Sequence, residues 1–95
     1  MARPFGAAVQ RSAHTLEQAI GLVITEIRAR EEISQSDLAH KLGYNTSYIG
    51  MIERGEKSIT LRTLGDLAEF FNTTSSRLLA RAERKQQKAK LGKGT

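Results

Sequence analysis

The sequence predicts an all-α fold, a small domain of five helices, on three observations. Leu, Ala, Ile, Glu, Arg and Lys dominate the 95 residues, and this mixture favours helices over strands. Proline occurs once, at Pro4, so no proline interrupts the body of the chain. Apolar residues recur at helical spacing in five successive stretches, each preceded by a Ser, Thr or Asn that can cap a helix.

The length is that of one domain with a single core, and we divide the chain into three parts. Residues 1–13 lack a sustained apolar period, so we expect a poorly ordered N-terminal arm. Residues 14–82 contain the capped apolar stretches and should form the domain. Residues 83–95 are a basic tail, which we expect to extend the fifth helix or to be disordered.

The first helix should begin beside Thr15, because Thr15 and Gln18 have the spacing of a capping box. Apolar residues then recur at helical spacing, which predicts a helix over residues 16–31. The stripe consists of Leu16, Ile20, Val23, Ile24 and Ile27.

Two short helices should follow. Ser34 can cap the first of them, and Gly43 can adopt the left-handed conformation that ends it. Asn45 can cap the second, and Gly55 can end it in the same way. The predicted helices span residues 35–42 and 46–53.

The last two helices are predicted from the same kinds of signal. Thr60 can cap an apolar run over residues 61–71, and Asn72 can turn the chain. Thr74 can cap a fifth helix, whose strong helix formers could carry it into the tail before Gly92. Only the first two turns of this helix carry enough apolar surface to be held firmly.

The net charge of +5 and the pI near 10.0 belong to the end of the chain. Residues 81–95 contain six Lys and Arg and one Glu, whereas residues 1–80 contain nine basic and nine acidic side chains. The overall charge therefore does not by itself indicate that the domain binds nucleic acid.

Several functional classes are excluded or disfavoured. The chain has no cysteine, which excludes disulfides and thiolate metal sites. His14 and His40 are far apart and have no ligand-type neighbours, so we expect neither a metal nor another cofactor. No catalytic motif is present, and we expect no enzyme. With no membrane span and no secretory signal, we expect a soluble cytoplasmic protein without membrane contact.

Two short capped helices joined across Gly43 match the helix-turn-helix arrangement, although a plain helical hairpin has the same spacing. ISQSDLAHKLG followed by YIGMIERGEKSITLRTLGDLAEFF resembles the Xre or Cro-like family of phage-repressor helix-turn-helix domains. The resemblance runs from about Leu16 to Leu79. The compact single-domain kind, similar to the controller proteins of restriction-modification systems, is the nearest variant. Prophage repressors and antitoxins use the same domain.

The resemblance implies a repressor-like, sequence-specific regulator of transcription that binds a double-stranded DNA operator as a homodimer. Residues 46–53 would be the recognition helix in the major groove. An alternative is an antitoxin-type module, whose last two helices bind a partner protein while DNA binding is secondary. A third interpretation makes the basic tail the main contact, with salt-sensitive binding to any polyanion.

The base-facing positions of the family correspond here to Thr46, Ser47, Gly50 and Met51. None of these is an Arg, Asn or Gln, the residues that make bidentate base contacts, so direct readout should be weak and tilted toward thymine. Arg54, or Arg3 or Arg11 in the arm, could add contacts outside the helix.

Residues at the helix ends should contact DNA phosphates, because free N–H groups and basic side chains gather there. The predicted phosphate contacts are Gln35, Tyr48, Arg54, Lys57, Ser58, Thr60 and Arg62.

Two further sets are structural. The resemblance implies an ion pair between Arg28 and Glu53 that ties the first helix to the recognition helix. Surplus apolar residues on the last two helices suggest a symmetric dimer interface, formed by Phe70, Leu78 and Leu79.

Overall fold

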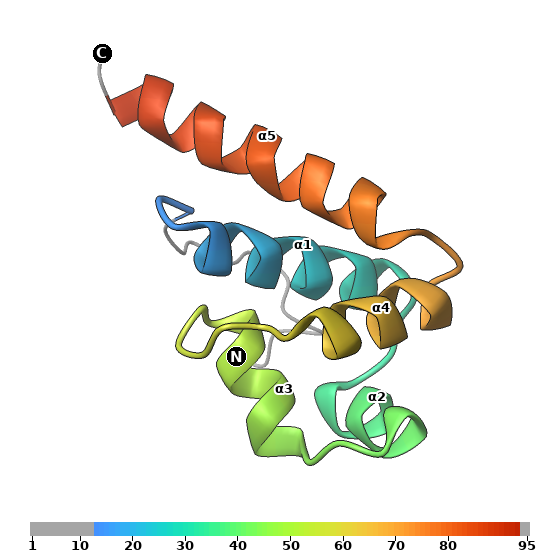
Figure 1. The fold of residues 1–95 in the computed structure, drawn as a ribbon. Helices are drawn as coiled ribbons and strands as arrows, with labels where there is room; N and C mark the ends of the chain where they lie inside the picture. The colour runs from blue at the N-terminus through green and yellow to red at the C-terminus, as the bar shows by residue number, and fades with distance from the viewer. Residues whose placement is uncertain (1–12, 94–95) are drawn as a thin grey trace.

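A computed structural model describes residues 13–93 of the chain, and these residues form five α-helices without a strand (Figure 1). The helices are α1 (Leu16–Arg30), α2 (Gln35–Leu42), α3 (Thr46–Glu53), α4 (Leu61–Phe70) and α5 (Ser75–Lys93). The predicted bounds of α2 and α3 are confirmed, while α1 and α4 each end one residue earlier than expected. Helix α5 continues past Gly92. None of the described helices is long and apolar enough to cross a membrane.

The proposed arm lies outside the described residues, apart from its last member. Arg3 and Arg11 therefore have no described position. Ala13, which the sequence assigned to the arm, is only 8 % exposed and belongs to the hydrophobic core. The packed domain thus begins at least one residue earlier than predicted.

Side-chain caps begin each helix, as the sequence predicted. Thr15 and Gln18 form the capping box of α1, in which Thr15 Oγ1 accepts from the Gln18 N–H at 3.0 Å and Gln18 Oε1 accepts from the Thr15 N–H at 3.1 Å. Single side-chain caps are made by Ser34, Asn45, Thr60 and Thr74. Because these contacts are local, the sequence alone located the start of every helix.

Left-handed residues end the first four helices. Gly43 has φ 79° and Gly55 has φ 72°, the conformation that glycine adopts without steric cost. After α1 and α4 the same position is filled by Glu32 (φ 56°) and Asn72 (φ 58°). In each case the next residue donates its N–H back into the last turn, as Glu56 does to the Met51 carbonyl at 2.9 Å. This Schellman geometry turns the chain sharply between helices.

The core lies between the five helices and is made of aliphatic side chains. Fully buried members come from every helix and include Ile24, Leu38, Ile49, Ile52, Leu64, Leu67 and Leu78. No charged group enters this core except Arg28 and Glu53 among the described residues, which are 4 % and 2 % exposed.

Helix α5 packs along α1 over more of its length than the sequence indicated. Ala82 is fully buried, and Ala89 packs against the core from the side of α5. Polar contacts reach equally far, because Gln86 Nε2 donates to the His14 carbonyl at 2.9 Å. Small Ala side chains leave room for close packing, and Ala itself favours the helical conformation.

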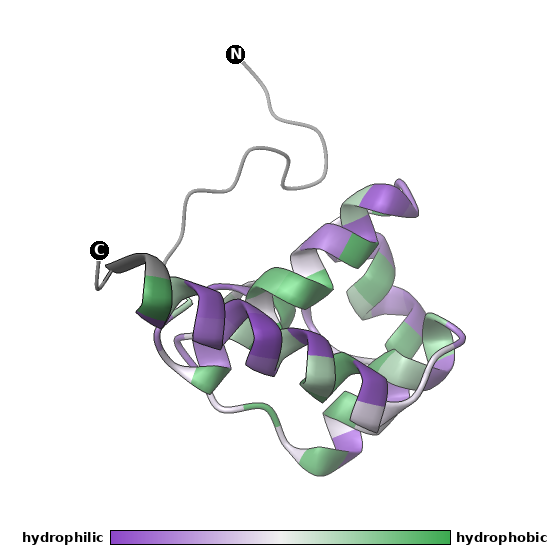
Figure 2. Ribbon diagram, turned by 90° about the horizontal axis from the view of Figure 1, so that it is seen from above, coloured by the Kyte–Doolittle hydropathy of each residue, from purple (hydrophilic) through white to green (hydrophobic). Residues whose placement is uncertain are grey.

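Helix α1 separates α5 from the helix-turn-helix. Figure 1 shows α5 along one side of α1, with α2 and α3 on the other side. Seen from above in Figure 2, α5 lies nearest the viewer and hydrophilic residues recur along it. The basic C-terminal helix and the α2–α3 pair are therefore on opposite sides of the domain.

Candidate nucleic-acid interface

The first turn of α3 presents small polar side chains to solvent. Asn45 is used as the cap, since its Oδ1 accepts from the Tyr48 N–H at 3.0 Å. Thr46 and Ser47 are exposed, and Met51, one turn after Ser47, is partly exposed. Three of the four predicted base-facing side chains therefore lie on one outward face of α3.

Gly50, the fourth, does not belong to that exposed face. It is buried, and a Cβ atom at Gly50 would lie 3.0 Å from Nη1 of Arg54. The Arg54 side chain thus covers Gly50 and is held there by Glu56, with Nε to Oε2 at 2.9 Å and Nη2 to Oε1 at 3.1 Å. The prediction of Gly50 as a base-facing position is corrected: the missing side chain makes room for Arg54.

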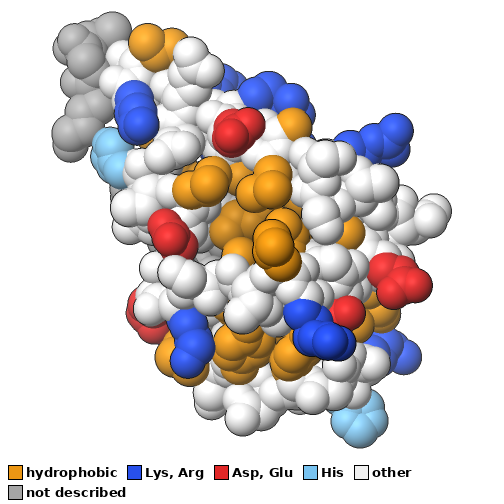
Figure 3. All heavy atoms as spheres, viewed as in Figure 1, with side chains coloured by type: hydrophobic (Ala, Val, Ile, Leu, Met, Phe, Trp, Pro, Cys, Tyr) orange, Lys and Arg blue, Asp and Glu red, His pale blue; other side chains and the backbone are white. Residues whose placement is uncertain are grey.

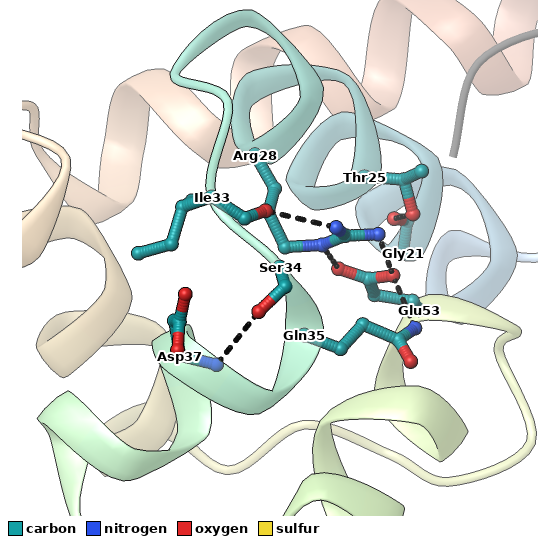
Figure 4. Close-up of polar contacts among 8 residues, drawn as sticks. All are labelled: Gly21, Thr25, Arg28, Ile33, Ser34, Gln35, Asp37 and Glu53. Atoms are coloured by element: carbon teal, nitrogen blue, oxygen red, sulfur yellow. Dashed lines mark hydrogen bonds and ion pairs between the residues drawn. The ribbon is translucent and has the colours of Figure 1, made fainter. Parts of the chain in front are cut away.

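A buried ion pair fixes the C-terminal end of α3 against α1, and Figure 4 shows its partners. Arg28 Nε donates to Glu53 Oε2 at 2.6 Å, and Arg28 Nη2 donates to Glu53 Oε1 at 3.0 Å. The remaining terminal nitrogen, Nη1, donates to the Ile33 carbonyl at 3.0 Å. The pair implied by the resemblance is present in the structure, and its bidentate geometry allows little rotation of α3 about this point.

Gln35 connects the start of α2 to the same carboxylate. Its Nε2 donates to Glu53 Oε1 at 2.8 Å, so the predicted phosphate-binding amide is engaged within the protein (Figure 4). One Nε2 hydrogen and the amide oxygen of Gln35 are left for other contacts. The N-terminus of α2, capped by Ser34, and the C-terminus of α3 are consequently held in one network.

Close packing of α1 against α3 depends on Gly21. A Cβ atom at this position would lie 2.3 Å from the Glu53 carbonyl oxygen and 2.6 Å from that of Ile52. These distances are too short for any side chain, so Gly21 lets the backbones meet. The role of Gly21 was not predicted from the sequence, although a glycine inside an apolar helical stripe is a recognisable signal.

A chain of hydroxyl groups links α3 to α4. Tyr44 Oη donates to Asp66 Oδ2 at 2.6 Å, and Thr63 Oγ1 donates to Tyr44 Oη at 3.2 Å. Tyr48 Oη is hydrogen-bonded to Thr63 Oγ1 at 3.0 Å. The hydrogen bond to Asp66 raises the pKa of Tyr44, because its carboxylate favours the protonated phenol. Tyr48, a predicted phosphate contact, already uses its hydroxyl here.

The other predicted phosphate contacts surround the α3–α4 loop, and they differ in whether the side chain already has a partner within the protein. Ser58 Oγ donates to Glu17 Oε2 at 3.2 Å, and Thr60 is the cap of α4. Lys57 and Arg62 are exposed and make no ion pair with any residue of the described part of the chain. The Lys57 ammonium lies 6.0 Å from the ring centre of Tyr48, at the edge of cation–π range.

The predicted dimer residues are scattered. Leu78 is 1 % exposed and fully inside the core, so its assignment to an interface was wrong. It lies on the inner face of α5, where it contributes to the domain's own packing. Phe70 is 36 % exposed and stacks edge-on against Phe71, with ring centres 5.2 Å apart. Leu79 is partly buried beside Leu61, which is 84 % exposed.

Metal-binding side chains do not cluster within residues 13–93. His40 is exposed on α2, and His14 is exposed just before α1. The polar groups around α3 are suited to hydrogen bonding and charge neutralisation.

Comparison with known proteins agrees with this geometry. Residues 24–78, more than half of the chain, match the helix-turn-helix family. Control protein C.SmaI of Serratia marcescens is 40 % identical over 58 residues, which cover 61 % of this chain and 69 % of that protein.

Solved structures show the same fold at low identity. A crystal structure of the clp gene regulator ClgR from Corynebacterium glutamicum matches with a TM-score of 0.80 and 19 % identity, over 84 % of this chain and 85 % of that one. A second ClgR structure gives a TM-score of 0.68 and 22 % identity, over 73 % and 90 % of the two chains. The chain belongs to the Xre-like helix-turn-helix family, whose members are DNA-binding transcriptional regulators and not enzymes.

Proposed function

We propose that the protein regulates transcription by binding a specific double-stranded DNA operator as a dimer, with α3 in the major groove. The observation that carries this proposal is the exposed, side-chain-bearing first turn of α3, held in place by the buried Arg28–Glu53 pair. Such a regulator acts in the cytoplasm, where the operator is accessible.

Thr46, Ser47 and Met51 supply the base contacts in this proposal. Hydroxyl groups can donate to or accept from several base edges, and the methyl groups of Thr46 and Met51 can contact thymine methyls. Without Arg, Asn or Gln on this face, each contact discriminates weakly. The rest of the specificity comes from DNA shape and from the spacing of two half-sites.

Lys57 and Arg62 are the strongest candidates for phosphate contacts, because both are exposed and unpaired in the described structure. Gln35 can donate its second amide hydrogen to a phosphate. The free backbone N–H groups in the first turn of α2 can donate to the same phosphate. Ser58, Thr60 and Tyr48 contribute secondarily, since each hydroxyl already has a protein partner. Arg54 must leave Glu56, or share it, before it reaches DNA.

The dimer surface in this proposal is a shallow apolar groove beside the α3–α4 loop. It is lined by Leu16, Ile20, Ile59, Leu61, Leu64 and Leu79, together with Glu17 and Ser58. Figure 3 shows hydrophobic side chains gathered near the centre of the face that contains α1 and α4. Leu61 is too exposed to serve the monomer's core and is the natural anchor for a second copy.

Phe70 does not share this groove. Phe70 is nine positions after Leu61, which places the two about 180° apart around α4. Phe70 instead lines a hollow with Lys41, Leu42, Asp66 and Glu69. Leu79 therefore remains in the proposed interface, and Leu61 takes the place of Phe70.

Selection of bound sites from a random DNA pool tests the function. Thr46→Ala with Met51→Ala should change which bases are preferred, whereas Arg62→Gln should weaken binding evenly and lower the salt slope by about 1. If the double variant selects the same sites as the parent while Arg54→Ala selects none, the reading residues lie outside the first turn of α3.

A further inference from the structure

A stripe of basic side chains runs along one face of α5. Its members recur at intervals of three and four residues, which places them on one side of the helix. At about 1.5 Å per residue the stripe is roughly 16 Å long. We call it the α5 basic stripe, and it consists of Arg77, Arg81, Arg84, Lys85 and Lys88.

Within the described residues, Glu26 is the one acidic side chain that forms ion pairs with the stripe. Its carboxylate contacts Lys85 Nζ at 2.5 Å and Arg81 Nη2 at 3.5 Å. Arg77, Arg84 and Lys88 are exposed and form no ion pair within residues 13–93. Most of the positive charge of the stripe is therefore available to an outside anion.

The stripe and the recognition helix face different directions. Helix α1 lies between α5 and the α2–α3 pair (Figure 1). The proposed dimer groove uses Leu79, which lies about 120–180° around α5 from the members of the stripe. Dimerisation through the groove therefore leaves the stripe exposed. A straight duplex bound by α3 cannot also reach the stripe.

The composition of the stripe favours phosphate over a folded protein as its ligand. Between Arg77 and Lys88 it presents long cationic side chains and no aromatic or large apolar residue. Protein interfaces obtain most of their affinity from a few buried anchors, chiefly Trp, Tyr and Arg. The stripe offers Arg but no aromatic partner, and Leu91 at one end is the one large apolar side chain exposed beside it among the described residues. Binding to the DNA backbone needs only the cations.

We propose that the α5 basic stripe binds the phosphate backbone of a second DNA segment while α3 holds the operator, so that one dimer bridges two duplex segments. This inference rests on the proposed function. Residues 1–80, which contain the recognition helix, are neutral overall, so the excess positive charge of the chain lies in residues 81–95. In this proposal that charge serves the second DNA segment and not the operator.

A two-duplex capture experiment tests it. Immobilised duplex carrying the selected operator is saturated with the dimer, washed, and exposed at about 50 mM salt to a labelled duplex of unrelated sequence. Arg84→Gln with Lys88→Gln should capture about tenfold less labelled duplex and lower the salt slope of capture by about 2, with operator affinity unchanged. The matched control is Arg30→Gln with Lys90→Gln, which removes the same charge off the stripe and should capture like the parent.

Three results would overturn the inference. Undiminished capture by the stripe variant would mean that recognition helices hold the second duplex. An equal loss of operator binding would mean that the stripe contacts the operator itself. Displacement of the labelled duplex by polyglutamate at a lower charge concentration than by DNA would assign the stripe to an acidic protein. Failure of the proposed function would appear earlier and separately, as a loss of preference for the immobilised operator.

Discussion

Glu53 is the residue on which the position of α3 depends. Both of its carboxylate oxygens accept hydrogen bonds, from Arg28 and from Gln35, and the group is 2 % exposed. Because a buried charge is tolerated only when it is paired and hydrogen-bonded, removal of one partner leaves the other in an unfavourable state.

Glu53→Ala should lower the free energy of unfolding by about 3–5 kcal/mol, since it leaves the Arg28 guanidinium buried without its counter-charge. Glu56→Ala is the control: it breaks an ion pair whose side chains are 49 % and 54 % exposed, and it should cost less than about 1 kcal/mol. Urea unfolding measures both. Unchanged unfolding of Glu53→Ala together with lost DNA binding would contradict the structural role.

Tyr44 provides a pH-dependent test at the same scale. Its pKa is raised in the folded protein by the hydrogen bond to Asp66, so the stabilisation is present below pH 10.0 and is lost as the pH rises through the folded pKa. Unfolding measured across this range should show a decline in stability that Tyr44→Phe lacks. A phenolate titration of Tyr44 at or below pH 10.0, obtained as the difference between parent and variant absorbance, would refute the assignment.

The single-residue features that the sequence predicted depend on partners close by in the chain. The caps at Thr15 and Asn45 involve partners three residues away, so spacing alone located them. The burial of Gly50 under Arg54 and of Leu78 within the core depends on side-chain direction and on neighbouring helices. The ion pair of Arg28 and Glu53 spans 25 positions and was anticipated from family resemblance, not from local pattern.

At the scale of elements, helix ends were predictable and helix contacts were not. Gly43 and Gly55 located the ends of α2 and α3 because their left-handed conformation is a property of the residue. Glu32 supplies the same conformation after α1 and carries no such signal. The packing of α5 was underestimated because its later turns are held by Ala and Gln contacts with the rest of the domain.

The contact between α1 and α3 predicts opposite effects for two Gly→Ala substitutions. Gly21→Ala should destabilise the protein by about 1–3 kcal/mol, because the added Cβ would overlap the Ile52 and Glu53 carbonyls. Gly65→Ala in α4 should stabilise it by about 0.5–1 kcal/mol, because its Cβ would meet only Ser75 Oγ at 4.0 Å and alanine favours the helix. Thermal unfolding of the two variants separates these outcomes. Equal and small effects would show that α1 and α3 are not in backbone contact.

At the scale of the whole molecule, the domain separates two surfaces. The first turn of α3 is nearly free of charge, whereas the excess positive charge lies on α5 across α1. The sequence located both stretches but could not show that they face apart, since that depends on how α1 packs between them. The apolar groove at Leu61 was missed for the same reason, because its lining comes from three helices and a loop.

Leu61→Glu tests the groove as the dimer surface. Leu61 is 84 % exposed, so the substitution should leave the fold intact while placing two carboxylates in a two-fold interface. Sedimentation at micromolar concentration should shift from dimer to monomer, and Leu91→Glu, at a side chain 65 % exposed on α5, should remain dimeric. A Leu61→Glu protein that stays dimeric would mean that the groove is not the dimer interface. The groove would then be the surface that binds a different protein, as in the antitoxin-type alternative.

The central claim, that the first turn of α3 lies in the major groove, can be tested directly by disulfide trapping. The chain has no cysteine, so Ser47→Cys provides a unique thiol. Operator duplexes are prepared with a thiol tether on cytosine N4, which faces the major groove, or on guanine N2, which faces the minor groove. Ser47→Cys should crosslink to the N4 tether only, and Lys90→Cys, on α5 but off the basic stripe, to neither. Crosslinking of Ser47→Cys to the N2 tether, or of Lys90→Cys to either, would contradict the account.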